Sequence, residues 1–401
     1  MKISMSFPRA TAIAAAAALA GMAAVTVAPA TAASKRSSAG LSCSSTLKIG
    51  FVTPLTGVAA YLGQEQLTWA KYAVATLPAK YGLKFKLVPG VTPVEQGPAP
   101  ALTLAQKYVA VKSVVGIIGP STSSAVAASS KTYNQAGIVQ ISPSATRTTL
   151  TKGDNQEATK SFFRVVPADD LQGPTDAGYM TDTLKVKNVV VIDFQEPYSQ
   201  GLGGEVENAL QKAGVTTSHQ SIANTVTDYS AYVTKVPSAA DIVFFPTQSP
   251  AAAQAFAGQL VEQGKKAKVF VGDGGFGPGA FKAPGSFASI FAPDVTTVAS
   301  SKSIVDGWKK ANPGKTAGSF GPPTYGAVQV MLTAIKAACT AGKGTIAQRS
   351  AVVAATRKVT IDQGWILGGK FRWSTTNTRD PSVTKFYLYE IQSDGSYKRV
   401  G

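Results

Sequence analysis

The chain has 401 residues, of which 44% are hydrophobic and 15% are charged, and 39 basic against 22 acidic residues give a formal net charge of +17. This apolar content excludes a disordered basic tail, and a length near 400 residues predicts two domains. Two cysteines, Cys43 and Cys339, and one histidine, His219, are too few for a structural zinc site or an iron–sulfur site. We therefore expect no metal site and no cofactor.

The first 32 residues have the pattern of an export signal. Two basic residues precede an alanine-rich apolar run at 10–28, and the small residues Ala30-Thr31-Ala32 follow it. This order predicts a signal peptide over 1–32, cleaved near Ala32, and then a linker over 33–45. A membrane anchor is the alternative, which the weak apolarity of alanine disfavours. We expect a mature protein that is secreted or held in the cell envelope.

The two cysteines are predicted to pair. In an oxidising compartment a Cys43–Cys339 disulfide is the natural outcome, and it would fix the mature N-terminus to a late helix. The alternative is lipidation of Cys43, which fits less well because this cysteine lies 15 residues beyond the apolar run.

After the linker, short apolar runs alternate with amphipathic stretches, which is the pattern of βαβ units and a largely parallel sheet. A first set has predicted strands at 47–52, 85–88, 114–118 and 138–141 and helices at 64–77, 103–111 and 123–136. A second set has strands at 188–194, 241–245, 268–271 and 385–391 and helices at 172–183, 199–213, 251–263 and 328–338.

Two loops in this pattern are rich in hydroxyl groups. Residues 119–124 follow one buried strand and open a helix, and residues 142–146 follow the next strand. Loops at the carboxyl ends of parallel strands are where α/β folds bind ligands, and a helix N-terminus favours an anion. The two loops therefore predict a site for a carboxylate or phosphate, although N-capping alone would also explain single hydroxyls.

Catalysis and nucleic-acid binding are less favoured interpretations. His219 lies in the polar stretch 216–220, which predicts a solvated loop or helix end, and no G-x-S-x-G motif accompanies the serine-rich loops. A secreted serine hydrolase thus remains a remote alternative. The lysines and arginines are scattered without an aromatic platform, so we expect no nucleic-acid partner.

Several motifs resemble the leucine/isoleucine/valine-binding family, the type I periplasmic solute-binding proteins of ABC importers. They are the runs Ile117–Ser124 and Gly137–Thr146, then Phe163-Arg164-Val165, Gln172-Gly173-Pro174, Tyr198-Ser199-Gln200-Gly201 and Tyr325-Gly326-Ala327. The resemblance implies an α/β fold of two doubly wound parallel-sheet lobes joined by a three-strand hinge. It places lobe 1 at 46–166 plus 300–378 and lobe 2 at 167–299 plus 379–401.

The family pattern also implies ligand-binding residues. Ser123 and Thr146 match the positions that bind the carboxylate of an amino acid, and Ser144 matches the residue whose carbonyl receives the ammonium group. Tyr198 matches a tyrosine that closes over the ligand from the second lobe.

Three further positions depart from the family. Its acidic ammonium partner falls on Gly274, with Asp273 adjacent, and its second-lobe aromatic falls on Gln248. The aromatic of the first loop is displaced to Tyr61. The carboxylate half of the site is kept, whereas the half that sets specificity is altered.

The resemblance implies a binding protein and not an enzyme. We expect an exported monomer that captures a small amino-acid-like, amide or carboxylate ligand by hinge closure and delivers it to an ABC permease and ATPase. A ligand sensor of the same fold is the alternative. Cleavage after Ala32 removes two basic residues and no acid, so the mature charge is 37 − 22 = +15.

Overall fold

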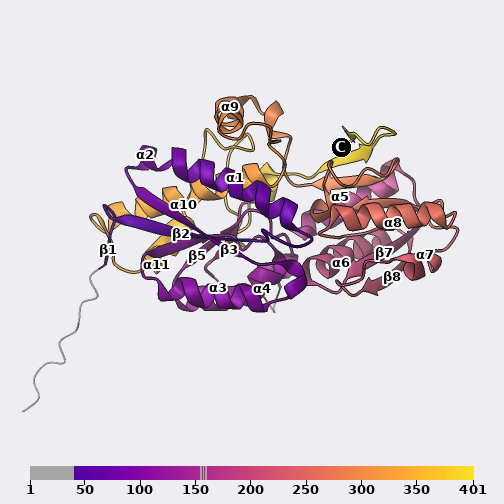
Figure 1. Cartoon of the computed structure of the whole chain (residues 1–401), viewed down its shortest axis with the longest axis horizontal. Helices are drawn as coiled ribbons and strands as arrows, with labels where there is room; N and C mark the ends of the chain where they lie inside the picture. Colours follow the sequence, from indigo (N-terminus) through magenta and orange to yellow (C-terminus); the bar gives the residue numbers. More distant parts are fainter. Residues whose placement is uncertain (1–39, 154–155, 157, 159) are drawn as a thin grey trace, which may run out of the picture. The chain divides into compact units, whose positions relative to one another are not determined.

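Apolar segments form the strands of two separate sheets in the computed structural model, which describes residues 40–153, 156, 158 and 160–401 (Figure 1). The predicted signal peptide and most of the predicted linker lie outside the described residues. The first sheet has five strands in the order β3-β2-β4-β5-β6, all parallel to their neighbours. They are β2 Thr46–Thr53, β3 Lys84–Val91, β4 Val114–Ile118, β5 Val139–Ser142 and β6 Phe162–Arg164.

The second sheet has seven strands in the order β14-β13-β11-β10-β9-β7-β8. They are β7 Asn188–Phe194, β8 Thr216–Ile222, β9 Ile242–Phe244, β10 Lys268–Val271, β11 Phe287–Ile290, β13 Tyr387–Ile391 and β14 Tyr397–Arg399. The strands from β7 to β11 are parallel, and the C-terminal hairpin of β13 and β14 joins them in antiparallel pairing.

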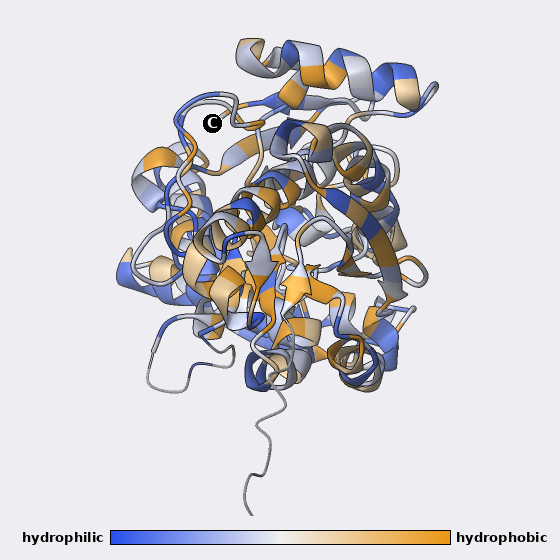
Figure 2. Cartoon of the chain, turned by 90° about the vertical axis from the view of Figure 1, so that its left-hand side faces the viewer, coloured by the Kyte–Doolittle hydropathy of each residue, from blue (hydrophilic) through white to orange (hydrophobic). Residues whose placement is uncertain are grey.

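Helices cover both faces of each sheet. In Figure 1, α1 and α10 lie on one side of the first sheet and α3 and α4 on the other, while Figure 2 shows that apolar residues concentrate in the central strands. Around the first sheet are α1 Ala60–Thr76, α2 Pro78–Tyr81, α3 Ala99–Ala110, α4 Ser123–Gln135, α9 Lys302–Ala311, α10 Gly321–Ala341 and α11 Ser350–Thr356. Around the second are α5 Asp169–Gly178, continued by the π-helical turn Tyr179–Thr183, α6 Pro197–Lys212, α7 Ser230–Thr234 and α8 Pro250–Glu262.

Short 3-10 turns complete the described structure. They are Val94–Gln96, Thr148–Leu150, Asp273–Gly275, Val295–Thr297, Ala299–Ser301 and Pro381–Val383. Burial explains the strands: all five residues of β4 are buried, as expected for a parallel sheet with helices on both faces. No helix in the described residues is long and apolar enough to cross a bilayer.

The expectation that His219 lies in a loop is wrong, because it lies on the edge strand β8. This strand is largely polar, and its pairing with β7 along seven residues holds it in place. The His219 ring bonds to Asp193 and, at 2.6 Å, to Glu207, and these bonds raise its pKa to about 9 despite partial burial. His219 is therefore a charged structural residue between two carboxylates.

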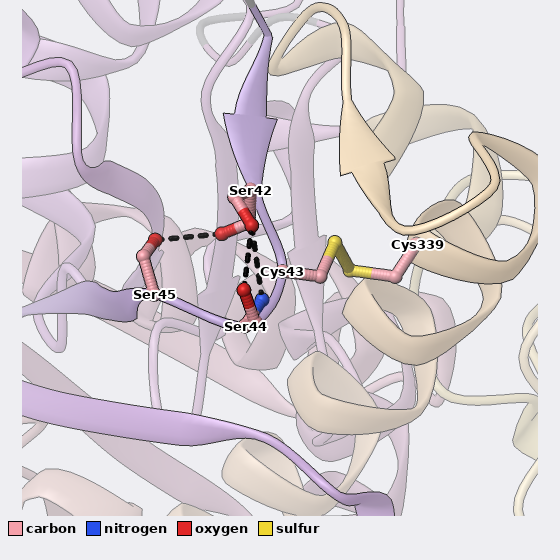
Figure 3. Close-up of a disulfide and its surroundings, with 5 residues drawn as sticks. All are labelled: Ser42, Cys43, Ser44, Ser45 and Cys339. Atoms are coloured by element: carbon pink, nitrogen blue, oxygen red, sulfur yellow. Dashed lines mark hydrogen bonds between the residues drawn. A yellow bond between two sulfur atoms is a disulfide. The ribbon is translucent and has the colours of Figure 1, made fainter.

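The predicted disulfide is present, and it joins Cys43 to Cys339 in α10 (Figure 3). Just before Cys43, β1 Leu41–Ser42 pairs with β12 Thr345–Ile346, and the Cys43 N–H donates to the Gly344 carbonyl at 2.9 Å. The end of the predicted linker is thus part of the fold. Closing a loop with a sequence separation of 296 residues stabilises the fold by at most about 5 kcal/mol through chain entropy.

Candidate functional site

The two hydroxyl-rich loops lie next to each other at the carboxyl ends of β4 and β5, because these strands are parallel neighbours. Ser142 connects them: its hydroxyl donates to the Pro120 carbonyl at 2.6 Å and accepts the Ala145 N–H at 3.0 Å. The Ser123 hydroxyl accepts the Arg147 N–H at 3.3 Å. Each loop therefore holds the other in position.

Gln66, on the buried face of α1, joins both loops to the end of β2 through hydrogen bonds of its side-chain amide. Its Oε1 accepts the hydroxyls of Ser121 at 2.6 Å and Thr53 at 2.8 Å, and its Nε2 donates to the Ser144 hydroxyl at 2.9 Å. Ser144 in turn donates to the Ser121 carbonyl at 2.6 Å. All four side chains are buried, so these hydrogen bonds satisfy polar groups that water does not reach.

Arg164, at the end of β6, binds the backbone of the second hydroxyl-rich loop, which follows β5. Its guanidinium is fully buried and donates to the carbonyls of Arg147 at 2.7 Å and Ala145 at 3.3 Å, as well as to the Thr151 and Thr378 hydroxyls. Burial lowers its pKa to about 10, so it stays charged at neutral pH. The two loop carbonyls that it binds are thereby satisfied by a buried cation.

Tyr198 and the turn after β10 face these loops from the second sheet. Tyr198 is the second residue of α6. The carboxylate of the N-cap residue Glu196 accepts the N–H groups of Tyr198 and Ser199 at 3.0 and 2.7 Å. The Tyr198 hydroxyl donates to Asp273 Oδ1 at 3.0 Å and accepts the Gly274 N–H at 2.9 Å. Because a Cβ at Gly274 would lie 2.8 Å from Tyr198, only glycine allows this close approach.

A small polar cavity of about 10 Å³, the room that one water molecule takes, lies between residues of the part of the chain around the first sheet and residues of the part around the second. Its walls come from α1, both hydroxyl-rich loops, α6, the turn before α8 and the turn after β10. They are formed by Leu62, Ser121, Thr122, Ser123, Ser144, Tyr198, Gln248, Asp273 and Gly274. The cavity therefore has hydroxyl groups and the N-terminus of α4 on one side and a carboxylate on the other.

Several hydrogen bonds among the described residues span the boundary between the two sheets, and two of them lie beside the cavity. The Tyr61 hydroxyl, on α1, donates to the Gly274 carbonyl at 2.5 Å, and Arg147 Nη1 donates to the Pro197 carbonyl at 3.1 Å. Tyr61 also packs edge-on against Phe320, with ring centroids 5.8 Å apart. Both bonds end on backbone carbonyls of the part of the chain built around the second sheet. They therefore form only when that part lies close to the first sheet and its helices.

The second side carries several buried acids. Burial raises the pKa of Asp273 to about 7, although hydrogen bonds from Tyr198 and Gln172 favour its charged form. Burial likewise raises the pKa of Glu196 to about 7, and it raises the pKa of Asp169 well above its ordinary value. A positive group placed against Asp273 would restore the charged carboxylate at lower pH.

The structure brings most of the predicted site residues together. Ser123, Ser144, Tyr198, Gln248 and Asp273 all line the polar cavity, and Tyr61 contacts its edge through Gly274.

Thr146 does not line this cavity. It is fully buried beside the start of α5, where its carbonyl accepts the Asp169 N–H at 2.9 Å and its side chain interacts with the Asp169 carboxylate. Thr146 therefore connects the second hydroxyl-rich loop to the first turn of α5.

Sequence reasoning missed Gln66, Glu196 and Arg164. A glutamine within the apolar face of the predicted helix at 64–77 was a signal for Gln66, because a buried amide needs partners. Glu196 directly before Pro197 had the pattern of a helix N-cap. Nothing local marks Arg164 as buried, since its partners come from residues as far away as Thr378.

Comparisons with known proteins place the chain among binding proteins. A family model described as periplasmic binding protein matches residues 46–396. An amino acid binding protein of Pseudomonas aeruginosa is 27% identical over 366 residues, which cover 88% of this chain and 92% of that protein. A leucine-, isoleucine-, valine-, threonine- and alanine-binding protein of the same organism is 27% identical over 320 residues, covering 76% of this chain and 81% of that protein.

Solved structures agree with the observed architecture. A leucine-binding protein from Thermotoga maritima has a TM-score of 0.78 at 20% identity and covers 89% of this chain and 98% of its own. A solute-binding protein of an ABC transporter from R. palustris, in complex with benzoate, has a TM-score of 0.75 at 18% identity, with coverages of 89% and 96%. These likenesses and the two sheets confirm the predicted fold class.

Replacing Gln66 tests its role in holding the loops. We expect Gln66→Met to lower the free energy of unfolding by about 3 kcal/mol, because the Thr53 hydroxyl and its neighbours lose buried partners. Gln64→Met on the exposed side of the same helix is the control, and we expect no measurable change. Urea unfolding of the mature chain, followed by circular dichroism, gives both values; equal stability of the two variants would contradict the proposed network.

Proposed function

Because the chain belongs to the periplasmic binding protein family, as its motifs predicted, we propose that the mature protein binds a small amino-acid-like ligand between two lobes and delivers it to an ABC importer. The observation that carries this proposal is the polar cavity, in which hydroxyls and a helix N-terminus face a buried carboxylate. Such a pair of opposed groups is complementary to a carboxylate and an ammonium group in one molecule.

The carboxylate of the ligand binds at the first lobe. Ser123 lies at the first position of α4, and its hydroxyl and the unpaired N–H groups of the helix end provide donors and partial positive charge. Thr146, at the family's second carboxylate-binding position, contributes a buried hydroxyl that now interacts with Asp169 and would turn to a carboxylate oxygen of the ligand. Ser144 lies between them, and its carbonyl accepts the ammonium group.

The ammonium group of the ligand pairs with Asp273. This carboxylate is 2% exposed, bonds to Tyr198 and lies one residue before the position where the family has its acid. A buried carboxylate without a positive partner is costly, and a ligand ammonium supplies that partner. Gly274 keeps the backbone close to Tyr198 and allows Asp273 to take this role.

Closure of the lobes excludes water from the ligand. We propose hinges near Val166-Pro167, Val298–Ser301 and Arg379–Ser382, between lobe 1 at 46–166 plus 300–378 and lobe 2 at 167–299 plus 379–401. The bonds from Tyr61 to Gly274 and from Arg147 to Pro197 stabilise the closed arrangement. A ligand that contacts both lobes shifts the population toward this state.

The remaining assignments follow from the family. Its members are extracytoplasmic binding proteins, and this chain carries a predicted signal peptide over 1–32. We propose that the mature protein acts as a monomer outside the cytoplasmic membrane, partners an ABC permease and its ATPase, and catalyses no reaction. The net charge of +15 then favours contact with the anionic surface of the envelope.

Calorimetric titration with amino acids tests the site. We expect Ser123→Ala to weaken binding of the best amino acid by about 10- to 100-fold, because one hydrogen bond to a charged group is lost. Ser124→Ala, one residue further along α4 and outside the cavity wall, is the matched control and should bind as the unmodified protein does. The absence of binding to all amino acids and small carboxylates by the folded protein would contradict the proposal.

The pH dependence of binding tests Asp273. Because its pKa without ligand is about 7 and an ammonium group pairs with the charged form, protons are released on binding below that pH. We expect affinity to rise about tenfold per pH unit from pH 5 towards pH 7 and then to level off. Asp273→Asn should bind weakly and lose this dependence; an unchanged pH profile in Asp273→Asn would exclude Asp273 as the ammonium partner.

A further inference from the structure

A second, larger pocket opens beside the polar cavity. It has a volume of about 280 Å³, and its walls are mostly apolar. Val58 and Val94 contribute from the loops of the first lobe, and Phe194, Val226, Tyr229 and Ala255 contribute from the second. The pocket therefore lies, like the polar cavity, between residues of both lobes, and we call it the apolar pocket.

Gln248 forms part of the wall of both spaces. Its side-chain Nε2 is buried, and the Gln248 amide interacts with the Glu196 carboxylate, which also lines the apolar pocket. Gln248 stands where the family has an aromatic residue. Among the described residues, Gln248 is the one side chain that lines both spaces, so a change in its rotamer is enough to connect them.

One wall of the apolar pocket consists of aromatic rings that pack against one another. The Tyr229 ring packs edge-on against Phe194 at 6.3 Å and against Phe256 at 5.9 Å between centroids. The Tyr229 hydroxyl donates to the Val226 carbonyl at 3.1 Å, so its polar end is already satisfied. This wall presents apolar surface and few free polar groups to a ligand.

The wall that the first lobe contributes includes an exposed apolar residue, Val58. Val58 has an exposed fraction of 48%, although its loop directly precedes α1 and the polar cavity. An exposed valine at the mouth of a site gains free energy when an apolar group covers it. The polar cavity, at about 10 Å³, holds only a water-sized group in this arrangement, so the side chain of a ligand needs space outside it.

We propose that the apolar pocket receives the side chain of the ligand, and that the ligand is an α-amino acid with a long unbranched or aromatic side chain in preference to a short branched one. The inference rests on the proposed function, because the carboxylate and ammonium groups must first be held in the polar cavity. The side chain then passes Gln248 and lies against Val58, Tyr229 and Ala255.

A series of straight-chain amino acids tests this inference. The probes are alanine, norvaline, norleucine and 2-aminooctanoic acid, with valine and phenylalanine for comparison, titrated calorimetrically into the mature protein. Burying one methylene group contributes about 0.8 kcal/mol, so we expect the affinity to rise about fourfold for each added carbon. Phenylalanine should bind more tightly than valine.

Ala255→Phe separates the apolar pocket from the polar cavity. Ala255 is an exposed residue of α8 and lines only the apolar pocket, so a phenylalanine there fills the pocket without touching Ser123 or Asp273. We expect this variant to bind alanine as before and to lose the gain with chain length. Val261→Phe, on the same helix at a position that is 75% exposed and outside the pocket wall, is the matched control and should keep the gain.

The outcomes separate the two proposals. Affinity that is flat or falls with chain length, while alanine still binds, overturns the inference and leaves the proposed function standing. An equal loss for alanine and norleucine in Ala255→Phe also overturns it. Failure of every amino acid to bind the folded protein overturns the proposed function and this inference together.

Discussion

The hydrogen bonds of Gln66 are the constraint on which the candidate site depends. One buried amide joins Thr53 at the end of β2, Ser121 after β4 and Ser144 after β5. Three parallel strands deliver these residues to one edge of the sheet, but a sheet alone does not set the conformation of the loops that follow it. The amide does so, because each alternative loop conformation would leave a buried polar group without a partner.

The part of the chain around the second sheet places acidic residues at the candidate site. The acids Asp169, Asp273 and Glu196 are buried near the boundary between the sheets, whereas the net charge of the chain is strongly positive. Buried acids at the site are complementary to the ammonium group that the proposed ligand carries.

The sequence was informative where a pattern is local. Apolar runs predicted β4 and β5, and small hydroxyl-bearing residues after them predicted the loops, because burial and the carboxyl ends of parallel strands determine both. The strand β8 was missed because Thr216–Ile222 is polar, and its pairing with β7 is a long-range interaction. The cavity wall was predicted at five positions by family resemblance. The burial of Thr146 away from that wall and the buried position of Arg164 depend on packing that no local pattern encodes.

The central claim is that hydroxyls of the first lobe and Asp273 of the second bind the two ends of one amino acid. A crystal structure of the mature protein grown with the tightest-binding amino acid of the chain-length series tests this claim most directly. The account predicts the carboxylate of the ligand within hydrogen-bond distance of Ser123 and its ammonium group against Asp273. A ligand bound with its carboxylate elsewhere, or with no contact to Asp273, would contradict it.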